Sequence, residues 1–340
     1  METKKIDVIA PSLGKRYSSA NSSMEAVIPK QSKLTNIVGL GFNLNKEKVP
    51  QITFKQFIFG CWRGKWRIWH ARRNIEKIVG LILRHIFRYK LILVSSTAGA
   101  RKISAFQEFL NNNMDAIVAV SKISAERVTK ETTTVYHGVD TTRFYPKDNK
   151  TNSKSIGVFG RIKKSKGVEE FIDASISVLS KNPEWKSYIY GEVKPKDKNF
   201  LEKLKNKVAK AGLNDRIIFS GFTDYFSIPK IYQNLDIVIC PSYSEGFGLP
   251  CLEAMASKCG VIATKTGVWT EIIDDGINGF LIETRSADQI AARLDILIND
   301  KELLNKIAEN GYNSIVDSFK IENEAEGLQK IYNHLIKQKK

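Results

Sequence analysis

The chain has 340 residues, of which 42% are hydrophobic and 26% are charged, so it is long enough for two globular domains and lacks a disordered composition. The formal net charge is +17, and residues 1–150 carry most of the excess, with 26 Lys and Arg against 11 Asp and Glu. A strongly basic half predicts an anionic partner, which leaves nucleic acid, an anionic membrane surface or a phosphorylated substrate. No apolar run approaches the roughly 18 residues of a membrane-spanning helix, and we expect no signal peptide because Asp7 interrupts the short apolar run near the N-terminus. Four scattered cysteines indicate a reducing compartment, so we expect a cytoplasmic protein.

Short apolar runs alternate with helical patterns along the first half, which predicts an α/β domain. Ile6–Ala10 predicts a first strand, and a polar loop follows at residues 11–23. Arg67–His70 predicts a later strand, and ligands of open α/β sheets bind outside the carboxyl ends of strands. His70 is therefore a candidate site residue, and a structural histidine is the alternative.

Residues 54–90 interleave aromatic and basic side chains. The aromatic residues are Phe54, Phe57, Phe59, Trp62, Trp66 and Trp69, and the basic ones are Lys55, Arg63, Lys65, Arg67, Arg72 and Arg73. This pattern is typical of surfaces that bind single-stranded nucleic acid or a membrane interface. The apolar residues of 74–89 recur at helical spacing, so they predict a helix that covers the sheet, while its basic side is free for membrane contact.

The second half restarts the alternation after a polar linker at 141–155. Ser155–Phe159 predicts a strand, and it runs into the segment G-R-I-K-K-S-K-G at Gly160–Gly167. This segment is not a Walker A loop, because no G-x₄-G-K-[ST] pattern fits it. It is either a solvated basic turn or a site for an anion.

Residues 236–264 predict a strand at Ile237–Cys240, a loop, a helix from Leu249 and a further strand. Glu245 and Glu253 stand eight residues apart, which is about 12 Å along a helix. A glycoside hydrolase pair requires about 5 to 9.5 Å, so this spacing favours contact with the two ends of a nucleotide sugar. The amides that begin the helix favour a phosphate between them, and they belong to Gly246, Phe247, Gly248 and Leu249. The alternative is a helix start with two solvated glutamates.

Three segments together resemble the family 4 retaining glycosyltransferases. E-G-F-G-L-P-C-L-E has the E-x₇-E pattern of that family, Gly160–Gly167 resembles its G-R-x₄-K-G element, and V-Y-H-G-V-D resembles its N-G-V-D segment. The resemblance implies the GT-B fold, in which two Rossmann-like α/β domains face each other across a cleft. It also implies an acceptor-binding domain at 1–145, a nucleotide-sugar domain at 155–320, and a helix at 321–340 that returns to the first domain.

The resemblance also implies roles for individual residues. Arg161 and Lys166 would bind the diphosphate, and Glu253 would accept hydrogen bonds from the ribose. Glu245 would orient the sugar, beside the amides of Phe247–Leu249, and His70 would lie near the reacting carbon. Arg72 and Arg73 are candidates for an acceptor phosphate or carboxylate. Where the family usually has adjacent glycines after the first strand, Ser18–Asn21 stands, so that loop is either a solvated turn or an acceptor loop.

Within the family, I-W-H-A-R-R-N, H-G-V-D and E-G-F-G-L are most similar to the mannosyltransferases of lipopolysaccharide core synthesis. This implies GDP-mannose as donor, a lipid-linked anionic acceptor, and peripheral association of the basic domain with the inner face of the cytoplasmic membrane. No D-x-D motif occurs, so we expect no cofactor and metal-independent activity, and we expect no nucleic-acid partner. The alternatives are a UDP-sugar transferase of the same family, a basic nucleic-acid-binding protein, and an epimerase or phosphorylase with the same fold.

Overall fold

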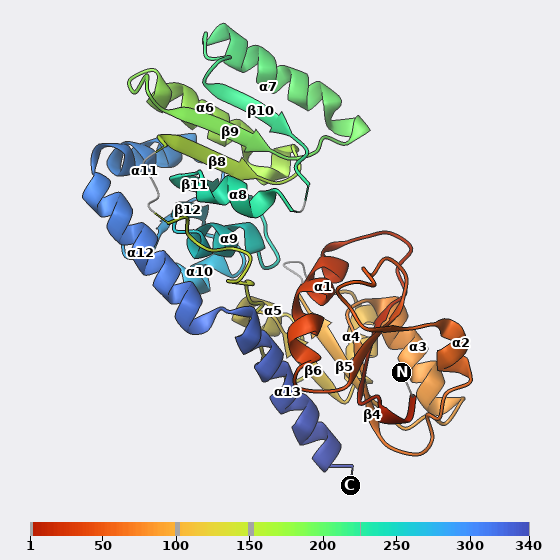
Figure 1. The fold of residues 1–340 in the computed structure, drawn as a ribbon. Coiled ribbons are helices and arrows are strands. Elements are labelled where there is room, and N and C mark those ends of the chain that lie inside the picture. The colour runs from red at the N-terminus through yellow and green to blue at the C-terminus, as the bar shows by residue number, and fades with distance from the viewer. Residues whose placement is uncertain (1–2, 99–102, 149–152, 225, 340) are drawn as a thin grey trace. The chain divides into compact units, whose positions relative to one another are not determined.

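The computed structural model describes residues 3–98, 103–148, 153–224 and 226–339, and the chain forms two compact units (Figure 1). One unit contains Met1–Asp140 together with Phe319–Lys340, and the other contains Thr141–Ser318. The boundary at Asp140 lies five residues before the predicted end of the first domain. Each unit is a Rossmann-like parallel sheet with helices on its faces, as the resemblance implied.

The first unit is built on a seven-stranded sheet of order β3-β2-β1-β4-β5-β6-β7, in which every pairing is parallel. Its strands are β1 (Val8–Ser12), β2 (Ile37–Gly41), β3 (Gln51–Ile52), β4 (Arg67–Ala71), β5 (Leu91–Thr97), β6 (Ala116–Ala119) and β7 (Thr133–Thr134). Its helices are α1 (Ser19–Gln31), α2 (Phe54–Ile58), α3 (Asn74–His85), α4 (Ala105–Asn112), α5 (Lys122–Ala125) and α13 (Ile321–Lys337).

Both faces of this sheet are buried, which is why its strands read as near-continuous apolar runs. Along β1, Val8 packs on one face and Ile9 on the other, because successive side chains of a strand point to opposite faces. The face of Val8 is covered by α1 and α13, and the face of Ile9 by α2 and α3. In α13, Ile321, Ala325, Leu328 and Tyr332 form the packed stripe.

Three of the six aromatic residues named above for residues 54–90 belong to the core. Trp62 and Trp69 are fully buried and Phe57 is nearly so, and the three rings pack together with centroid separations of 4.9 and 6.0 Å from Phe57. Phe59, in contrast, is 81% exposed. The prediction of an interface from this interleaving is therefore wrong for the two tryptophans, since a buried ring cannot stack on a base or enter a headgroup layer.

The second unit has a six-stranded parallel sheet of order β10-β9-β8-β11-β12-β13. Its strands are β8 (Ser155–Phe159), β9 (Lys186–Tyr190), β10 (Ile217–Gly221), β11 (Ile237–Cys240), β12 (Gly260–Thr264) and β13 (Phe280–Ile282). Its helices are α6 (Val168–Leu179), α7 (Lys198–Lys210), α8 (Ile228–Gln233), α9 (Leu249–Ala256), α10 (Trp269–Ile272), α11 (Ala287–Asn299) and α12 (Lys301–Ser318).

Helices of this unit bury one sheet face through a continuous cluster. Ile156 and Val158 of β8 pack with Phe171 of α6, Leu204 of α7 and Leu294 of α11. In the described part of the chain, no helix combines the length and the apolar character needed to cross a bilayer.

Candidate active site

In each sheet, the order in which the chain adds strands reverses at one place. In the second unit the chain builds β8, β9 and β10 to one side and then returns to add β11, β12 and β13 to the other, so β8 and β11 are neighbours. In the first unit the same reversal lies between β1 and β4. Ligands of open α/β sheets bind outside the carboxyl ends of the strands at such switch points. Loops 160–167 and 241–248 leave the second switch point, and loops 13–18 and 72–73 leave the first.

The two loops of the second switch point pack directly against each other. The Tyr243 amide donates to the Ser165 carbonyl at 3.1 Å, and Lys166 Nζ donates to a Glu245 carboxylate oxygen. Gly167 has a φ of +67°, and a Cβ there would lie 2.0 Å from the Pro241 carbonyl oxygen. Only glycine permits both this left-handed backbone and this close approach. The G-R-x₄-K-G and E-x₇-E segments therefore meet at one point.

Positive charge gathers in the loop after β8. Arg161 is exposed, and burial together with the charges of Arg161 and Lys166 lowers the pKa of Lys163. Glu245 is the acid that pairs with Lys166. Neighbouring positive charges destabilise each other's charged form, and a bound anion relieves this repulsion. The loop is therefore chemically suited to a diphosphate.

The loop that leads into α9 is held by an aromatic side chain. Gly248 has a φ of +84°, and a Cβ there would lie 2.4 Å from Trp269 Nε1. Trp269 Nε1–H donates to the Gly248 carbonyl at 3.0 Å, and Phe247 is buried. These contacts set the direction of the Gly248 and Leu249 amides at the start of α9, where the helix dipole favours a phosphate.

Glu253 lies in α9, one turn beyond the first residues of the helix. Burial raises its pKa to about 7, against the opposing effects of the Arg143 charge and a hydrogen bond from Tyr232. The Tyr232 hydroxyl donates to Glu253 Oε2 at 3.3 Å, and its ring stacks on Phe159 with centroids 4.2 Å apart. Glu253 is half-buried, and its ionised form can accept hydrogen bonds from sugar hydroxyls.

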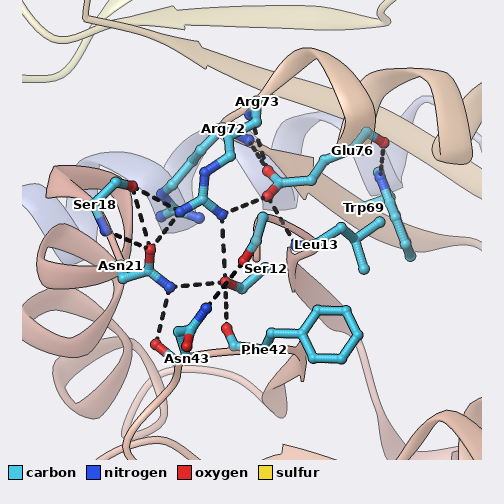
Figure 2. Close-up of polar contacts among 11 residues, drawn as sticks. Ser12, Leu13, Ser18, Asn21, Phe42, Asn43, Trp69, Arg72, Arg73 and Glu76 are labelled. Atoms are coloured by element: carbon cyan, nitrogen blue, oxygen red, sulfur yellow. Dashed lines mark hydrogen bonds and ion pairs between the residues drawn. The ribbon is translucent and has the colours of Figure 1, made fainter. Parts of the chain in front are cut away.

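The first switch point contains a dense polar network around Arg73 (Figure 2). Glu76 is fully buried and accepts from the amides of Arg72 at 2.7 Å and Arg73 at 2.9 Å. The Arg73 guanidinium donates to Glu76 at 3.0 Å and to Ser18 at 2.7 Å, and it also donates to Asn21. The network thus connects the starts of α1 and α3.

His70 lies near the carboxyl end of β4 but is enclosed by protein. Its Nδ1 is 2.5 Å from the Tyr332 hydroxyl and its Nε2 is 2.7 Å from the Ser96 hydroxyl, and none of the side chain is exposed. Burial, and then the positive charge of Arg72, hold its pKa well below the ordinary value, so the imidazole is neutral. The catalytic role of His70 stays a prediction, and contact with a substrate requires one of these two hydroxyls to give way.

The sequence-predicted residues thus fall into two groups. Arg161, Lys166, Gly246, Phe247, Gly248, Leu249, Glu245 and Glu253 belong to the second switch point, whereas His70, Arg72 and Arg73 belong to the first. The sequence reading missed Tyr232 and Arg143, for which no motif exists. It also missed that Asn21 and Glu76 bind Arg73, although S-x-x-N at 18–21 and R-x-x-E at 73–76 have the spacing of helix-capping pairs. Across the described residues, no group of three His, Cys, Asp or Glu side chains gathers as metal ligands would.

Comparison with known proteins finds relatives of this chain in both sequence and structure. The profile described as "Glycosyl transferases group 1" matches residues 140–314. The lipopolysaccharide core biosynthesis mannosyltransferase LpsB of Rhizobium meliloti is 34% identical over 99% of this chain and 100% of its own length. The crystal structure of the C-terminal domain of the group 1 family protein LpcC from Francisella tularensis is 51% identical, with a TM-score of 0.53, and covers 54% of this chain and all of that domain.

A more distant structure matches both units. The crystal structure of Anabaena HepE in complex with UDP and glucose covers 97% of this chain and 100% of its own, with a TM-score of 0.81 at 19% identity. At that identity the likeness concerns the fold alone. It agrees with two Rossmann-like domains of the GT-B type.

Proposed function

Because the chain belongs to the group 1 glycosyltransferases, we propose that it is a retaining enzyme that transfers mannose from GDP-mannose to a lipid-linked anionic acceptor such as the lipopolysaccharide inner core. The observation that carries the donor half of this proposal is the meeting of loops 160–167 and 241–248 at the switch point of the second sheet. The mannose and the acceptor are supported by the names of LpsB and its relatives.

The donor is held by residues of both loops in this proposal. Arg161 and Lys166 contact the diphosphate, with the Gly248 and Leu249 amides at the start of α9 beside it. Glu253 accepts from the ribose hydroxyls, and Glu245 orients the sugar. The cations and the helix start supply positive charge where the departing phosphate oxygen becomes negative, so we propose that no metal is needed.

The chemical step follows from retention of configuration. The bond between the anomeric carbon and the phosphate oxygen breaks, and the acceptor oxygen attacks the same carbon from the same face. The acceptor proton passes to the departing phosphate oxygen, so no carboxylate acts as nucleophile. The role of the protein is to stabilise the leaving diphosphate and to hold both substrates in place.

The acceptor half of the proposal uses the basic unit, with Arg72 and Arg73 near the acceptor. We propose a cytoplasmic enzyme that associates peripherally with the inner face of the cytoplasmic membrane. Ile75, Ile82 and Ile86 are exposed at spacings of seven and four residues, which places them on one side of α3 and its C-terminal end. This apolar line on a basic unit suits an anionic bilayer.

The membrane proposal is tested by sedimentation with vesicles. We expect the protein to sediment with phosphatidylglycerol vesicles and not with phosphatidylcholine vesicles, and high salt to weaken the binding. Replacement of Ile82 and Ile86 by Ser is expected to reduce it. Equal binding to both lipids would contradict the anionic part of the proposal.

The donor proposal is tested by thermal unfolding with GDP, UDP, ADP and their sugars, without added metal. A ligand that binds only the folded protein stabilises it by about 2.7 kcal/mol at 100 times its dissociation constant. We expect GDP and GDP-mannose to raise the melting temperature in the wild type but much less in Arg161→Ala. Selective stabilisation by UDP or ADP would keep the transferase and contradict the mannose donor, and oligonucleotide binding in place of any nucleotide effect would favour a nucleic-acid-binding protein.

A further inference from the structure

We propose that Arg72 and Arg73 have different tasks: Arg72 binds an oxyanion of the acceptor, a carboxylate or a phosphate, while Arg73 and Glu76 are positioning residues that hold it in place. This inference rests on the proposed function, because it names the group that the acceptor must carry. Three observations on the first switch point lead to it (Figure 2).

The first observation is that the terminal N–H groups of Arg73 are already engaged. Its Nη1 donates to Glu76 at 3.0 Å and to the Ser12 hydroxyl at 3.4 Å, and its Nη2 donates to the Ser18 hydroxyl at 2.7 Å and to Asn21. A guanidinium has four terminal N–H groups, so these partners use all of them. Gly14 closes the space, since a Cβ there would lie 3.1 Å from Arg73 Cζ.

The second observation is that Glu76 ties the two loops of this switch point together. Its Oε1 accepts from the Leu13 amide at 3.2 Å, and its Oε2 accepts from the Arg72 amide at 2.7 Å and the Arg73 amide at 2.9 Å. With the Arg73 guanidinium these make four donors on one carboxylate that is fully buried. The loop after β1 and the loop after β4 are therefore fixed relative to each other.

The network also explains the missing glycines. Asn21 is fully buried and donates at 2.9 Å both to the Ser12 hydroxyl and to the Asn43 carbonyl, while its side-chain oxygen accepts from the Ser18 amide at 3.0 Å. The start of α1 is thus used to hold Arg73. Ser18 and Asn21 therefore contact a side chain of this protein at the place where the family usually has adjacent glycines.

The third observation is that Arg72 has donor capacity to spare. Its Nη1 is buried without a hydrogen-bond partner in the part of the chain that the structure describes. Its charge depresses the pKa of His70 and opposes the rise in the pKa of Tyr332, so two groups that are neutral near pH 7 lie within reach of its charge. A buried cationic donor without a partner is costly, and an oxyanion is the partner that matches its geometry.

Together these observations indicate different roles for the two adjacent arginines. Arg73 and Glu76 hold each other and both loops, and the hydrogen bond from the Arg72 amide to Glu76 orients Arg72, whose Nη1 has no partner among the described residues. An acceptor that carries a carboxylate or phosphate is then selected over a neutral one.

The test is equilibrium binding of a defined probe, so it does not depend on turnover. Deacylated lipopolysaccharide inner core, which carries carboxylates, is titrated into the full-length protein beside the same oligosaccharide with its carboxyl groups methyl-esterified and its phosphates removed. We expect the wild type to bind the charged form ~10-fold or more tightly than the neutral form, as a charge-assisted hydrogen bond in a buried place allows. Arg72→Gln is expected to abolish this preference, and Arg72→Lys to keep part of it.

Two controls separate this result from general effects of charge or folding. Arg63→Gln removes an exposed arginine of the same basic unit and is expected to leave the preference unchanged. GDP binding to Arg72→Gln is expected to stay within about twofold of the wild type, because the donor site belongs to the other unit. Glu76→Gln is expected to weaken the preference although Arg72 is intact.

A wild type without preference, or a preference that survives in Arg72→Gln, would overturn the inference. Failure of the proposed function gives a different result, since it would appear as absence of nucleotide-sugar binding in the thermal experiment. The two titrations use different ligands and are read independently.

Discussion

At the switch point of the first sheet, the charge of Arg73 is matched by buried Glu76 and every terminal N–H group of its guanidinium has a partner. At the corresponding place in the second sheet, Arg161 is exposed and one short loop holds four basic residues, of which Lys166 forms an ion pair with Glu245. The topology of the two sites is the same, and the difference lies in how far each is completed by its own side chains. A site whose polar groups are already paired holds its loops in place. A site with unpaired positive charge can instead bind an anion.

The largest expected effect tests the switch point of the first sheet, where Arg73 is paired with Glu76. Glu76→Gln replaces a buried carboxylate by an amide that cannot accept from four N–H groups and leaves Arg73 without its counter-ion, so we expect a loss of about 3 kcal/mol in the free energy of unfolding. Denaturant unfolding measures this. Glu47→Gln, which changes an exposed carboxylate of the same unit, is the control and should cost almost nothing. If both variants are equally stable, the first site is not held by Glu76.

The next effect tests the switch point of the second sheet, where Arg161 is exposed. Arg161→Ala removes an exposed cation, so we expect unchanged stability but a loss of about 1.5–3 kcal/mol in the binding of GDP, which is roughly 10- to 150-fold. Isothermal titration calorimetry measures it. Lys210→Ala, at an exposed position of α7, is the matched deletion of a cation and should leave the affinity unaltered. A loss of stability without a loss of affinity would mean that Arg161 is structural.

A smaller effect concerns pH. The pKa of Glu253 is about 7 in the folded protein and 4.5 ordinarily, so its burial costs stability progressively as pH rises from 4.5 to 7 and in full above that. Ribose hydroxyls donate to the ionised form, so the affinity for GDP-mannose should rise with pH, by up to about tenfold per unit below pH 7. GDP-mannose is the suitable probe because its diphosphate diester does not titrate in this range.

Glu253→Gln provides the control for this pH dependence. The amide has no charge to lose, so its affinity for GDP-mannose should be flat between pH 5 and pH 8, as checked by titration in buffers of equal ionic strength. A slope that persists in the variant would assign the dependence to another group.

The smallest effect concerns the surroundings of His70. Tyr332→Phe removes the hydroxyl that lies 2.5 Å from His70 Nδ1 and 3.4 Å from the Gln31 amide nitrogen, so we expect a loss of about 1 kcal/mol in stability. Binding of GDP should not change, because α13 belongs to the first unit. Tyr145→Phe, at a half-exposed position, is the control for stability. A large effect on nucleotide binding alone would connect His70 to the donor.

Much of this architecture follows from local sequence. Strands such as Ser155–Phe159 and Ile237–Cys240 and the helix at 321–337 lie where apolar runs and helical spacing predict them, because burial on both faces of a parallel sheet leaves a strong pattern. The two-residue strand β3 and the short helices α2 and α5 were missed, since so few residues carry no periodicity. The aromatic residues of 54–90 led to a wrong prediction of an interface, because their interleaving with basic residues does not reveal that Trp62 and Trp69 are buried.

Less of the site could be predicted. The G-R-x₄-K-G and E-x₇-E segments stand out in the sequence, but the left-handed backbone of Gly167 and Gly248 cannot be read there. The contact of Lys166 with Glu245 joins segments 79 residues apart, and that of His70 with Tyr332 joins segments 262 apart, so neither leaves a trace in local sequence. The division of tasks between Arg72 and Arg73 is equally invisible there, because two adjacent arginines are chemically identical until their partners are known.

The most direct test of the contrast between the two sites is a pair of matched arginine deletions titrated with GDP in the absence of metal. We predict that Arg161→Ala loses at least about tenfold in affinity, while Arg72→Ala binds GDP as the wild type does. Equal losses in both variants, or a loss in Arg72→Ala alone, would contradict the assignment of the nucleotide to the second unit.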